Sequence, residues 1–229
     1  MNDVCDHDNH DDFVMARQRS ISTHRARGSG SKQEDPEAVL ENAVFWADEV
    51  RSLTENVSGA LRNTLIDLAS VLGDKHRWCL MGGLAAGFHS QPRGTQDVDI
   101  AVAGEAELDN LVETARNSGK FKKSRAHALV HKESGVEVEL ITHEHVKCDA
   151  DLLSRIIDTA ISVNLGGTPV PVASREGVVA SKLLRGSYMD LADIQRIIES
   201  DGPVDLSGFD LSTEQLTKYN EVEKIAMGS

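Results

Sequence analysis

The stretch that decides the fold begins at Met81-Gly82-Gly83-Leu84-Ala85-Ala86 and resumes at Arg93-Gly94-Thr95-Gln96-Asp97-Val98-Asp99-Ile100. The short apolar run Trp78–Met81 leads into the two glycines and is typical of a buried strand. Two glycines directly after a strand let the backbone turn tightly and approach a ligand closely. A helix that begins at this turn directs its free N–H groups and its dipole toward that ligand. The first half of the stretch therefore predicts a phosphate-binding turn.

Carboxylates gather in the second half of the stretch. Asp97 and Asp99 are two residues apart on a predicted strand, so their side chains share one face. Two close carboxylates repel each other unless a cation lies between them, and Mg²⁺ (or Mn²⁺) bound with substrate phosphates would relieve that repulsion. Glu137 and Glu139 also share a face, and a neighbouring antiparallel strand would bring Glu139 beside the aspartates. Three acids around two metal ions suit in-line displacement at phosphorus.

Other phosphate-binding patterns fit this chain less well. The sequence has no G-x-x-x-x-G-K-[ST] loop, and the segment 82–87 does not satisfy G-x-G-x-x-G. A haloacid-dehalogenase-type nucleophile would follow an apolar strand, whereas Asp97 and Asp99 open one. His143-Glu144-His145 lacks further ligands at zinc spacing, which favours a polar loop.

Composition limits the kind of protein. The 229 residues are 40% hydrophobic, which is enough for one sizeable core with a small helical appendage. The formal net charge of −13 does not attract nucleic acid by bulk electrostatics, although it leaves a local basic patch open. Cys5, Cys79 and Cys148 imply neither a disulfide framework nor a zinc site. With no long apolar run and a polar N-terminus, we expect a cytoplasmic protein without a membrane segment.

Four segments are expected along the chain. Residues 1–34 combine a His/Asp-rich start with Arg and Gly-Ser runs, and are predicted to be a disordered tail. Residues 35–74 are predicted to form N-terminal helices, because Asp35-Pro36-Glu37 is a strong helix start. Residues 75–173 are predicted to form the core, and 174–229 a C-terminal helical segment. The fold class is α/β (α+β): a small mixed sheet flanked by helices, with added helices at both ends.

The element pattern follows from apolar periodicity. We expect helices at 58–72, 84–89, 105–117, 152–161, 175–184, 188–199 and 213–225. We expect strands at 78–81, 98–102, 128–131, 136–141 and 168–172. The strands at 128–131 and 136–141 should form an antiparallel pair. The last strand is expected at the sheet edge, because Pro169 and Pro171 cannot donate ladder hydrogen bonds.

These motifs resemble the DNA polymerase β-like nucleotidyltransferase superfamily, most closely its minimal, AbiEii-toxin-like bacterial branch. That superfamily shows G-G-x-A, then R-x-T-x-D-h-D, then a strand with a third acid. Its members often continue with a helix carrying K-L and a D-x-x-D-I segment, here Lys182-Leu183 and Asp190-Leu191-Ala192-Asp193-Ile194. The resemblance covers about residues 77 to 200. It implies the nucleotidyltransferase fold, an NTP substrate and a divalent metal.

The resemblance also implies roles for individual residues. Gly82 and Gly83 would hold the triphosphate, and Asp97, Asp99 and Glu139 would be the metal ligands and catalytic acids. Arg93, Thr95 and Lys182 would complete the nucleotide site, although Arg93 reads equally as an exposed loop arginine, Thr95 as a loop cap, and Lys182 as a solvated helix residue. Asp190 and Asp193 match a segment of less certain role. The third acid is usually Asp, so Glu139 departs from the pattern, and Glu137 is a rival on the same face.

Two functions follow as hypotheses. The first is an enzyme that moves a nucleoside monophosphate from an NTP such as ATP to an acceptor hydroxyl on a protein, a tRNA or a small molecule. The AbiEii-like resemblance would make it the toxin of a toxin–antitoxin system, with an antitoxin as partner. The alternative is a catalytically silent module on the same fold that binds nucleotide or a regulatory partner, because a longer third acid can misplace the metal.

Overall fold

The computed structural model describes residues 35–55 and 59–228. The predicted tail at 1–34 and the predicted helix start at Ser58 lie outside these residues. The helices are α2 (Pro36–Glu55), α3 (Ala60–Leu72), α4 (Gly82–Phe88), α5 (Glu105–Asn117), α6 (His143–Val146), α7 (Ala150–Asp158), α8 (Arg175–Arg185), α9 (Tyr188–Asp201) and α10 (Thr213–Met227). The strands are β1 (Trp78–Leu80), β2 (Val98–Val102), β3 (Phe121–Arg125), β4 (Ala128–His131), β5 (Glu137–Ile141), β6 (Ile161–Leu165) and β7 (Thr168–Val172).

Aspartates cap the first two helices. The Asp35 carboxylate accepts a hydrogen bond from the Glu37 N–H at 3.1 Å, which confirms the predicted start of α2. The N-terminus of α3 follows Gly59, which has no side chain to cap it. Asp48 on α2 serves instead, because its carboxylate accepts from the Leu61 N–H at 2.7 Å and the Arg62 N–H at 3.1 Å. This long-range cap fixes α3 against α2.

The strands form one mixed sheet in the order β3-β4-β5-β2-β1-β7-β6. The pairs β1–β2, β3–β4, β4–β5 and β6–β7 are antiparallel, whereas β1–β7 and β2–β5 are parallel. The antiparallel β4–β5 pair is as predicted. The expectation that β5 runs antiparallel to β2 is wrong, because α5, β3 and β4 return the chain to the end of the sheet at which β2 begins. The predicted mixed sheet flanked by helices is confirmed.

The expectation of an edge position for β7 is also wrong, since β7 lies between β1 and β6. A two-residue loop, Gly166-Gly167, joins β6 to β7, so Leu165 and Thr168 form a hydrogen-bonded pair. Alternation along the hairpin then puts Pro169 and Pro171 at positions that do not bond to β6. Their nitrogens face the β1 side, where pairing occurs only at Val172 beyond both prolines. The prolines therefore interrupt no ladder bond.

Other departures concern short or exposed elements. β3 and β6, the two edge strands, were not expected, and the predicted helix at 152–161 ends at Asp158 so that Ile161 begins β6. His143–Val146, expected as a loop, forms the one-turn helix α6, which Thr142 caps by accepting from the His145 N–H. The predicted segment boundaries at 74/75 and 173/174 fall in connections between elements and stay predictions.

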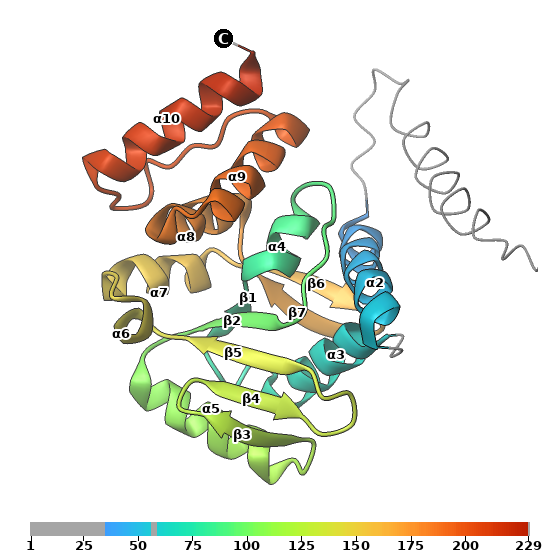
Figure 1. Ribbon diagram of the computed structural model, residues 1–229. Coiled ribbons are helices and arrows are strands. Elements are labelled where there is room, and N and C mark those ends of the chain that lie inside the picture. The colour runs from blue at the N-terminus through green and yellow to red at the C-terminus, as the bar shows by residue number, and fades with distance from the viewer. Residues whose placement is uncertain (1–34, 56–58, 229) are drawn as a thin grey trace, which may run out of the picture. The chain divides into compact units, whose positions relative to one another are not determined.

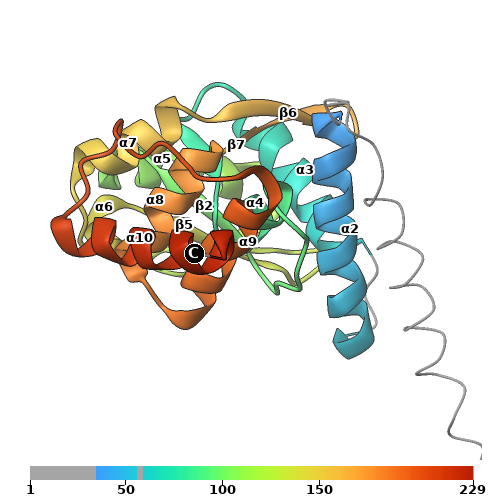
Figure 2. The same ribbon diagram turned by 90° about the horizontal axis from the view of Figure 1, so that it is seen from above.

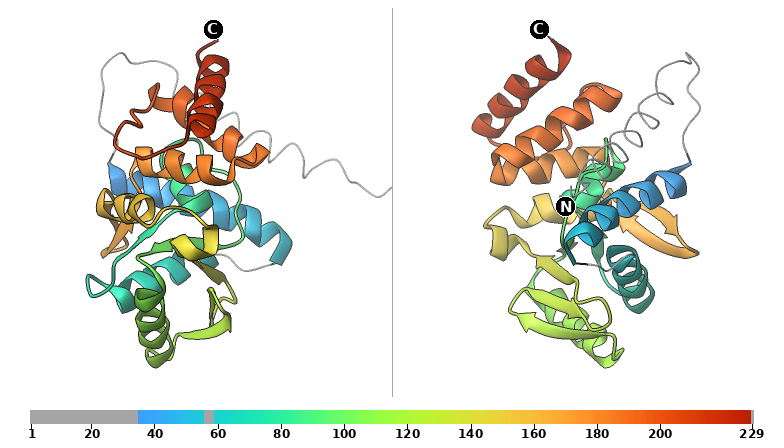
Figure 3. Two further views of the ribbon diagram at one scale, coloured as in Figure 1. Left: turned by 90° about the vertical axis from the view of Figure 1, so that its left-hand side faces the viewer. Right: turned by 45° about the vertical axis from the view of Figure 1, so that its right-hand side comes forward.

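The helices surround the sheet unevenly. In Figure 1, α8, α9 and α10 stack at one end beyond α4 and α7, whereas α5, β3 and β4 occupy the other end. Seen from above, α2 lies on the opposite side from α6 and α7 (Figure 2). The β6–β7 hairpin runs beside α2 (Figure 3).

Among the described helices, none has the length and apolar character needed to cross a lipid bilayer.

Candidate functional site

The glycine turn after β1 lies directly against the second aspartate of the Asp-x-Asp pair. The Met81 N–H donates to the Asp99 carbonyl oxygen at 2.9 Å, which ties the end of β1 to β2. Gly82 has a φ of +65°, and a Cβ at this position would lie 1.7 Å from Asp99 Oδ2. Only glycine permits both this left-handed backbone and this approach. The glycine turn and the Asp99 carboxylate are therefore in direct contact, and this contact requires glycine at position 82.

Gly83 brings the loop before β2 into the same place. A Cβ at this position would lie 3.1 Å from Thr95 Oγ1 and 3.3 Å from Arg93 Nη2. The Gly83 N–H also donates to the carboxylate of Asp99. Thr95 Oγ1 donates to Asp97 Oδ1 at 2.9 Å, which orients that carboxylate. The structure therefore brings Gly82, Gly83 and the whole loop from Arg93 to Asp99 together.

Three acids converge at this turn. Asp97, Asp99 and Glu139 each offer a carboxylate oxygen, and these oxygens all lie within 4.8 Å of one another. The pairing of β2 with β5 explains the convergence, because Asp99 and Glu139 are direct partners in the register and point to one face. Glu139 therefore lies beside the aspartates, as expected, although β5 is parallel to β2 rather than antiparallel.

The electrostatics of the group favour a bound cation. Burial, together with repulsion from Asp97 and Glu139, raises the pKa of Asp99 to about 6. Carboxylate oxygens are the ligands that Mg²⁺ and Mn²⁺ prefer, and opposite ligands of an octahedral Mg²⁺ lie about 4.2 Å apart. Oxygens that all lie within 4.8 Å of one another are compatible with shared coordination of such an ion. The donor set therefore fits a divalent metal.

Glu137, the rival third acid, does not join this group. Its carboxylate forms an ion pair with Arg125 on β3, which is the strand beyond β4. Both glutamates lie on the same face of β5. Arg125 pairs with Glu137 and leaves Glu139 near the two aspartates. Of the two glutamates, Glu139 is therefore the one that the structure brings to the aspartates.

The basic residues expected to bind phosphate lie in a buried ionic network. Arg93 donates through Nε and Nη2 to the two oxygens of Asp193, at 2.8 and 2.9 Å. The buried Lys182 ammonium lies 2.7 Å from Asp193 and 3.3 Å from Asp190. Asp190 also accepts both hydrogen bonds of the Arg185 guanidinium, at 2.7 and 2.8 Å. The D-x-x-D segment therefore holds the three cations in place.

This network fixes the charge of its carboxylates. Although burial acts in the opposite direction, hydrogen bonds from Arg93 and the charge of Lys182 hold the pKa of Asp193 below its ordinary value. Burial would also raise the pKa of Asp190. Hydrogen bonds from Arg185 and Ser187 outweigh this effect, so the pKa of Asp190 is lowered as well. Both aspartates are thus ionised at neutral pH and balance the cations that they contact, of which Lys182 is buried and Arg185 is largely exposed.

A cavity of about 250 Å³ opens between the acid group and the C-terminal helices. Gly82, Asp99, Lys182, Arg185 and Asp190 line its polar side. Its apolar side consists of Met81, Ile141, Val146, Leu153 and Leu184. Asp99 and two cations of the ionic network, Lys182 and Arg185, therefore face the same space.

Sequence reasoning missed Arg185 as a residue of this site. The side chain lies on the cavity wall and feels the negative charges of Asp99 and Glu139, which contribute to raising its pKa after the larger effect of Asp190. The available signal was its position one turn after Lys182, directly beyond the predicted helix 175–184, which in the structure extends to Arg185.

Comparisons with known proteins support the fold. No protein-family model matches the sequence, and no curated protein does so either. A crystal structure of an antigenic nucleotidyltransferase-like protein from Paracoccidioides brasiliensis matches with a TM-score of 0.55 and 22% identity, covering 73% of this chain and 89% of that one. The antibiotic-resistance factor ANT(2'')-Ia matches over 72% and 83% (16% identity, TM-score 0.33), and CdnC with ATP from E. coli MS115-1 over 85% and 65% (13% identity, TM-score 0.33). The first of these shows that the chain has a nucleotidyltransferase-like fold.

Proposed function

We propose that this chain is a metal-dependent nucleotidyltransferase. It transfers a nucleoside monophosphate from an NTP to an acceptor hydroxyl and releases pyrophosphate. The observation that carries this proposal is the convergence of Asp97, Asp99 and Glu139 at the Gly82-Gly83 turn. An anionic cluster beside a backbone turn without side chains suits a ligand that arrives as a triphosphate with divalent cations.

Different residues would position the metal ions and the triphosphate. Asp97, Asp99 and Glu139 hold Mg²⁺ or Mn²⁺, which when bound offsets the charge on the phosphate oxygens and favours in-line attack. Gly82 and Gly83 leave room for the triphosphate, and Thr95 keeps Asp97 in its ligand orientation. The acceptor oxygen forms a bond to the α-phosphorus as the bond to the pyrophosphate oxygen breaks, and the acceptor proton leaves toward the acid group.

The cations of the ionic network act on the leaving group. Lys182 and Arg185 face the cavity beside Asp99, where they offset the charge that develops on pyrophosphate. Arg93 lies against Gly83 and keeps its orientation through Asp193. Asp190 and Asp193 are therefore positioning residues in this proposal, because they act through the cations that they bind.

The acceptor and the biological setting follow from charge and resemblance. A net charge of −13 opposes unaided binding of tRNA, so we propose a hydroxyl on a protein or a small molecule as the preferred acceptor. The likeness to AbiEii-type proteins adds the proposal that the chain is the toxin of a toxin–antitoxin pair in the cytoplasm, with an antitoxin as its partner.

The test is transfer of an α-labelled NTP in the presence of Mg²⁺ or Mn²⁺, with pyrophosphate release measured in parallel. Acceptors offered are total cell protein, total tRNA and pooled small-molecule alcohols. The variant Asp97→Asn with Asp99→Asn should lose transfer, whereas Asp109→Asn, an exposed acid on α5, should retain it. Transfer that persists in the double variant would refute the assignment.

The same experiment separates the alternative of a silent nucleotide-binding module. Glu139 in place of the usual Asp is the observation that favours this alternative. Thermal stabilisation by NTP and metal, without pyrophosphate release or label transfer on any acceptor, would establish it. Stabilisation accompanied by turnover would exclude it.

A further inference from the structure

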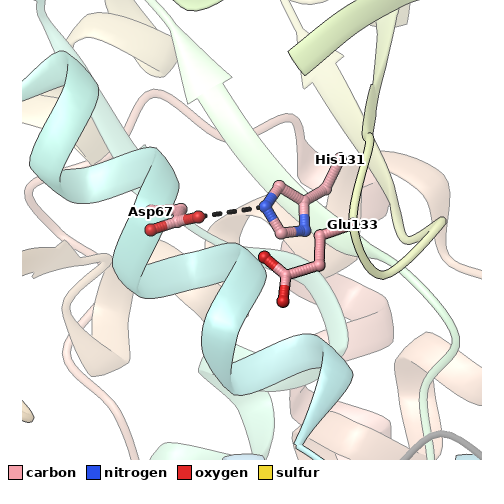
Figure 4. Close-up of side chains that lie close together, drawn as sticks. All are labelled: Asp67, His131 and Glu133. Carbon is pink, nitrogen blue, oxygen red and sulfur yellow. Dashed lines mark hydrogen bonds and ion pairs between the residues drawn. The ribbon is translucent and has the colours of Figure 1, made fainter. Parts of the chain in front are cut away.

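A second group of metal-capable side chains lies on different elements. Within residues 35–55 and 59–228, two groups of at least three such residues occur: the acids described above, and Asp67, His131 and Glu133. Asp67 lies on α3, His131 ends β4, and Glu133 lies in the turn between β4 and β5. Figure 4 shows the three side chains converging, and one ligand atom from each lies within 4.8 Å of the others.

The Asp67–His131 pair already has nearly the geometry of two ligands on one metal. His131 Nε2 lies 3.0 Å from Asp67 Oδ2, and the imidazole is almost completely buried. Two such ligands on a tetrahedral Zn²⁺, each at about 2.1 Å, lie roughly 3.4 Å apart. Replacing the shared proton by a zinc ion would therefore require a separation of only a few tenths of an ångström.

The other imidazole nitrogen has the partners that a metal-binding histidine needs. His131 Nδ1 lies 2.8 Å from Ser134 Oγ and 3.2 Å from Thr64 Oγ1. The Thr64 hydroxyl donates its own hydrogen to the Ala60 carbonyl at 2.7 Å, so its oxygen is left to accept. Without metal, Nε2 faces Asp67 and the Ser134 N–H donates to Nδ1 at 3.4 Å, which is the arrangement of an imidazole protonated at Nε2. Metal binding at Nε2 requires the proton to move to Nδ1, where the Ser134 and Thr64 hydroxyl oxygens are within reach to accept it. This observation is independent of the acidic residues.

Charges around the group leave it with an excess of negative charge. The Asp67 carboxylate forms an ion pair with Lys120 and a hydrogen bond with His131. Lys120 contacts Asp67 Oδ1 and leaves Oδ2 to face His131. Glu133 is exposed, turns toward the pair, and forms no hydrogen bond or ion pair within the described part of the chain. Two carboxylates thus face one ammonium group.

We propose that Asp67, His131 and Glu133 form a zinc site that is separate from the nucleotidyl-transfer site. One nitrogen and two carboxylate ligands leave the fourth position of a tetrahedral Zn²⁺ to water. The imidazole makes this group unsuited to Mg²⁺, whereas the all-carboxylate group at Asp99 suits Mg²⁺ or Mn²⁺. The ion fastens α3 to the β4–β5 hairpin, and β5 is the strand that carries Glu139.

The test compares two Glu→Gln variants of the full chain after removal of metals with a chelator. Glu133→Gln removes an exposed carboxylate that forms no hydrogen bond or ion pair with the described residues, so the variant should fold as the parent does. Glu113→Gln, at an exposed position on α5, is the matched control and keeps every other acid and histidine, including those of residues 1–34. Zinc affinity is measured by competition with a chromophoric chelator, and anomalous scattering at the zinc edge locates the ion in crystals.

We expect Glu133→Gln to weaken the tightest zinc site at least tenfold relative to Glu113→Gln, since changes even in the outer shell of metal sites cost ten- to a hundredfold. The anomalous peak should lie between Asp67 and His131. Equal zinc affinities in the two variants would overturn the proposal, as would an anomalous signal found only at other residues. Both variants retain Asp97, Asp99 and Glu139, so failure of this proposal is distinct from failure of the proposed function.

Discussion

The raised pKa of Asp99 gives a prediction that runs against the usual effect of removing a buried polar contact. Without metal, Asp99→Asn should make the protein more stable at neutral pH. The folded state holds the proton of Asp99 up to about pH 6, whereas the ordinary pKa is 3.8. The folded state therefore loses stability as pH rises from about 4 to about 6, and the full cost is present above pH 6.

The magnitude follows from this difference in pKa. Each pKa unit corresponds to 1.36 kcal/mol, so ionising Asp99 costs the folded state about 3 kcal/mol as an upper bound. Asparagine is uncharged and can still accept the hydrogen bond from the Gly83 N–H. For a domain of this size, a gain of 3 kcal/mol raises the melting temperature by roughly 6–12 °C.

The assay is urea and thermal unfolding in EDTA at pH 7.5 and at pH 4. The gain in Asp99→Asn should be present at pH 7.5 and largely absent at pH 4, where the wild-type carboxyl is protonated. Asp109→Asn controls for the loss of one surface charge and should change little at either pH. Adding Mn²⁺ should stabilise the wild type more than Asp99→Asn. A variant that is destabilised in EDTA at pH 7.5, or stabilised equally at both pH values, would refute the reasoning.

Three further changes test the remaining parts of the site. Gly82→Ala should lower nucleotidyl transfer at least a hundredfold, because its Cβ would overlap the neighbouring carboxylate, whereas Gly87→Ala meets its nearest atom only at 3.4 Å and should retain activity in the same assay. Glu139→Gln should lose metal-dependent transfer, and Glu137→Gln should keep most of it; equal losses in steady-state rates would remove the distinction between them. Asp193→Ala should cost about 3–5 kcal/mol in urea unfolding, because it removes the carboxylate partner of Arg93 and one of the two carboxylates that contact the buried Lys182. Since the pKa of Asp193 is lowered, the stability that it contributes should disappear as pH falls through that pKa, and a pH-independent loss would contradict this account.

The elements that the sequence predicted best have at least one buried surface. The bounds of β2 and α5 are as expected, because an apolar run and a helical stripe both reflect full burial of one surface. The two missed strands are the edges of the sheet. In β3 only Phe121 is buried, and charged or polar residues fill the rest, as suits a strand that must not pair with another chain. An edge strand therefore lacks the apolar signal by which strands are recognised.

The direction of β5 and the position of the proline-containing β7 in the sheet could not be predicted from the sequence, because both depend on the neighbouring strands. Whether β5 runs parallel or antiparallel to β2 depends on how many strands intervene, and the unrecognised β3 changed that number. The prolines of β7 were interpreted correctly as unable to donate. What the sequence did not show is that β1 pairs with β7 only at Val172, after both prolines, so that a strand inside the sheet can accommodate both.

The choice between the two glutamates of β5 shows how side-chain partners complete what periodicity begins. A period of two places Glu137 and Glu139 on one face and cannot rank them. The ion pair with Arg125 occupies Glu137 and so distinguishes it from Glu139. Arg125, however, lies on β3, a strand that the sequence pattern did not predict. The identity of the third acid therefore depended on the least predictable element of the sheet.

The surroundings of the basic residues also depend on contacts that the sequence pattern does not show, here contacts with the C-terminal helices. From the sequence, 174–229 is an appended helical segment, and Lys182 reads equally as a phosphate-binding residue and as a solvated helix residue. In the structure Lys182 is 3% exposed and lies between Asp190 and Asp193, while Asp193 also holds Arg93 from the loop before β2. Burying this lysine requires both carboxylates, and fixing the arginine requires α9 against the glycine turn. The helices after β7 thus belong to the site itself, and a chain ending at residue 173 would retain the three acids but lose Lys182, Arg185 and the carboxylate that orients Arg93.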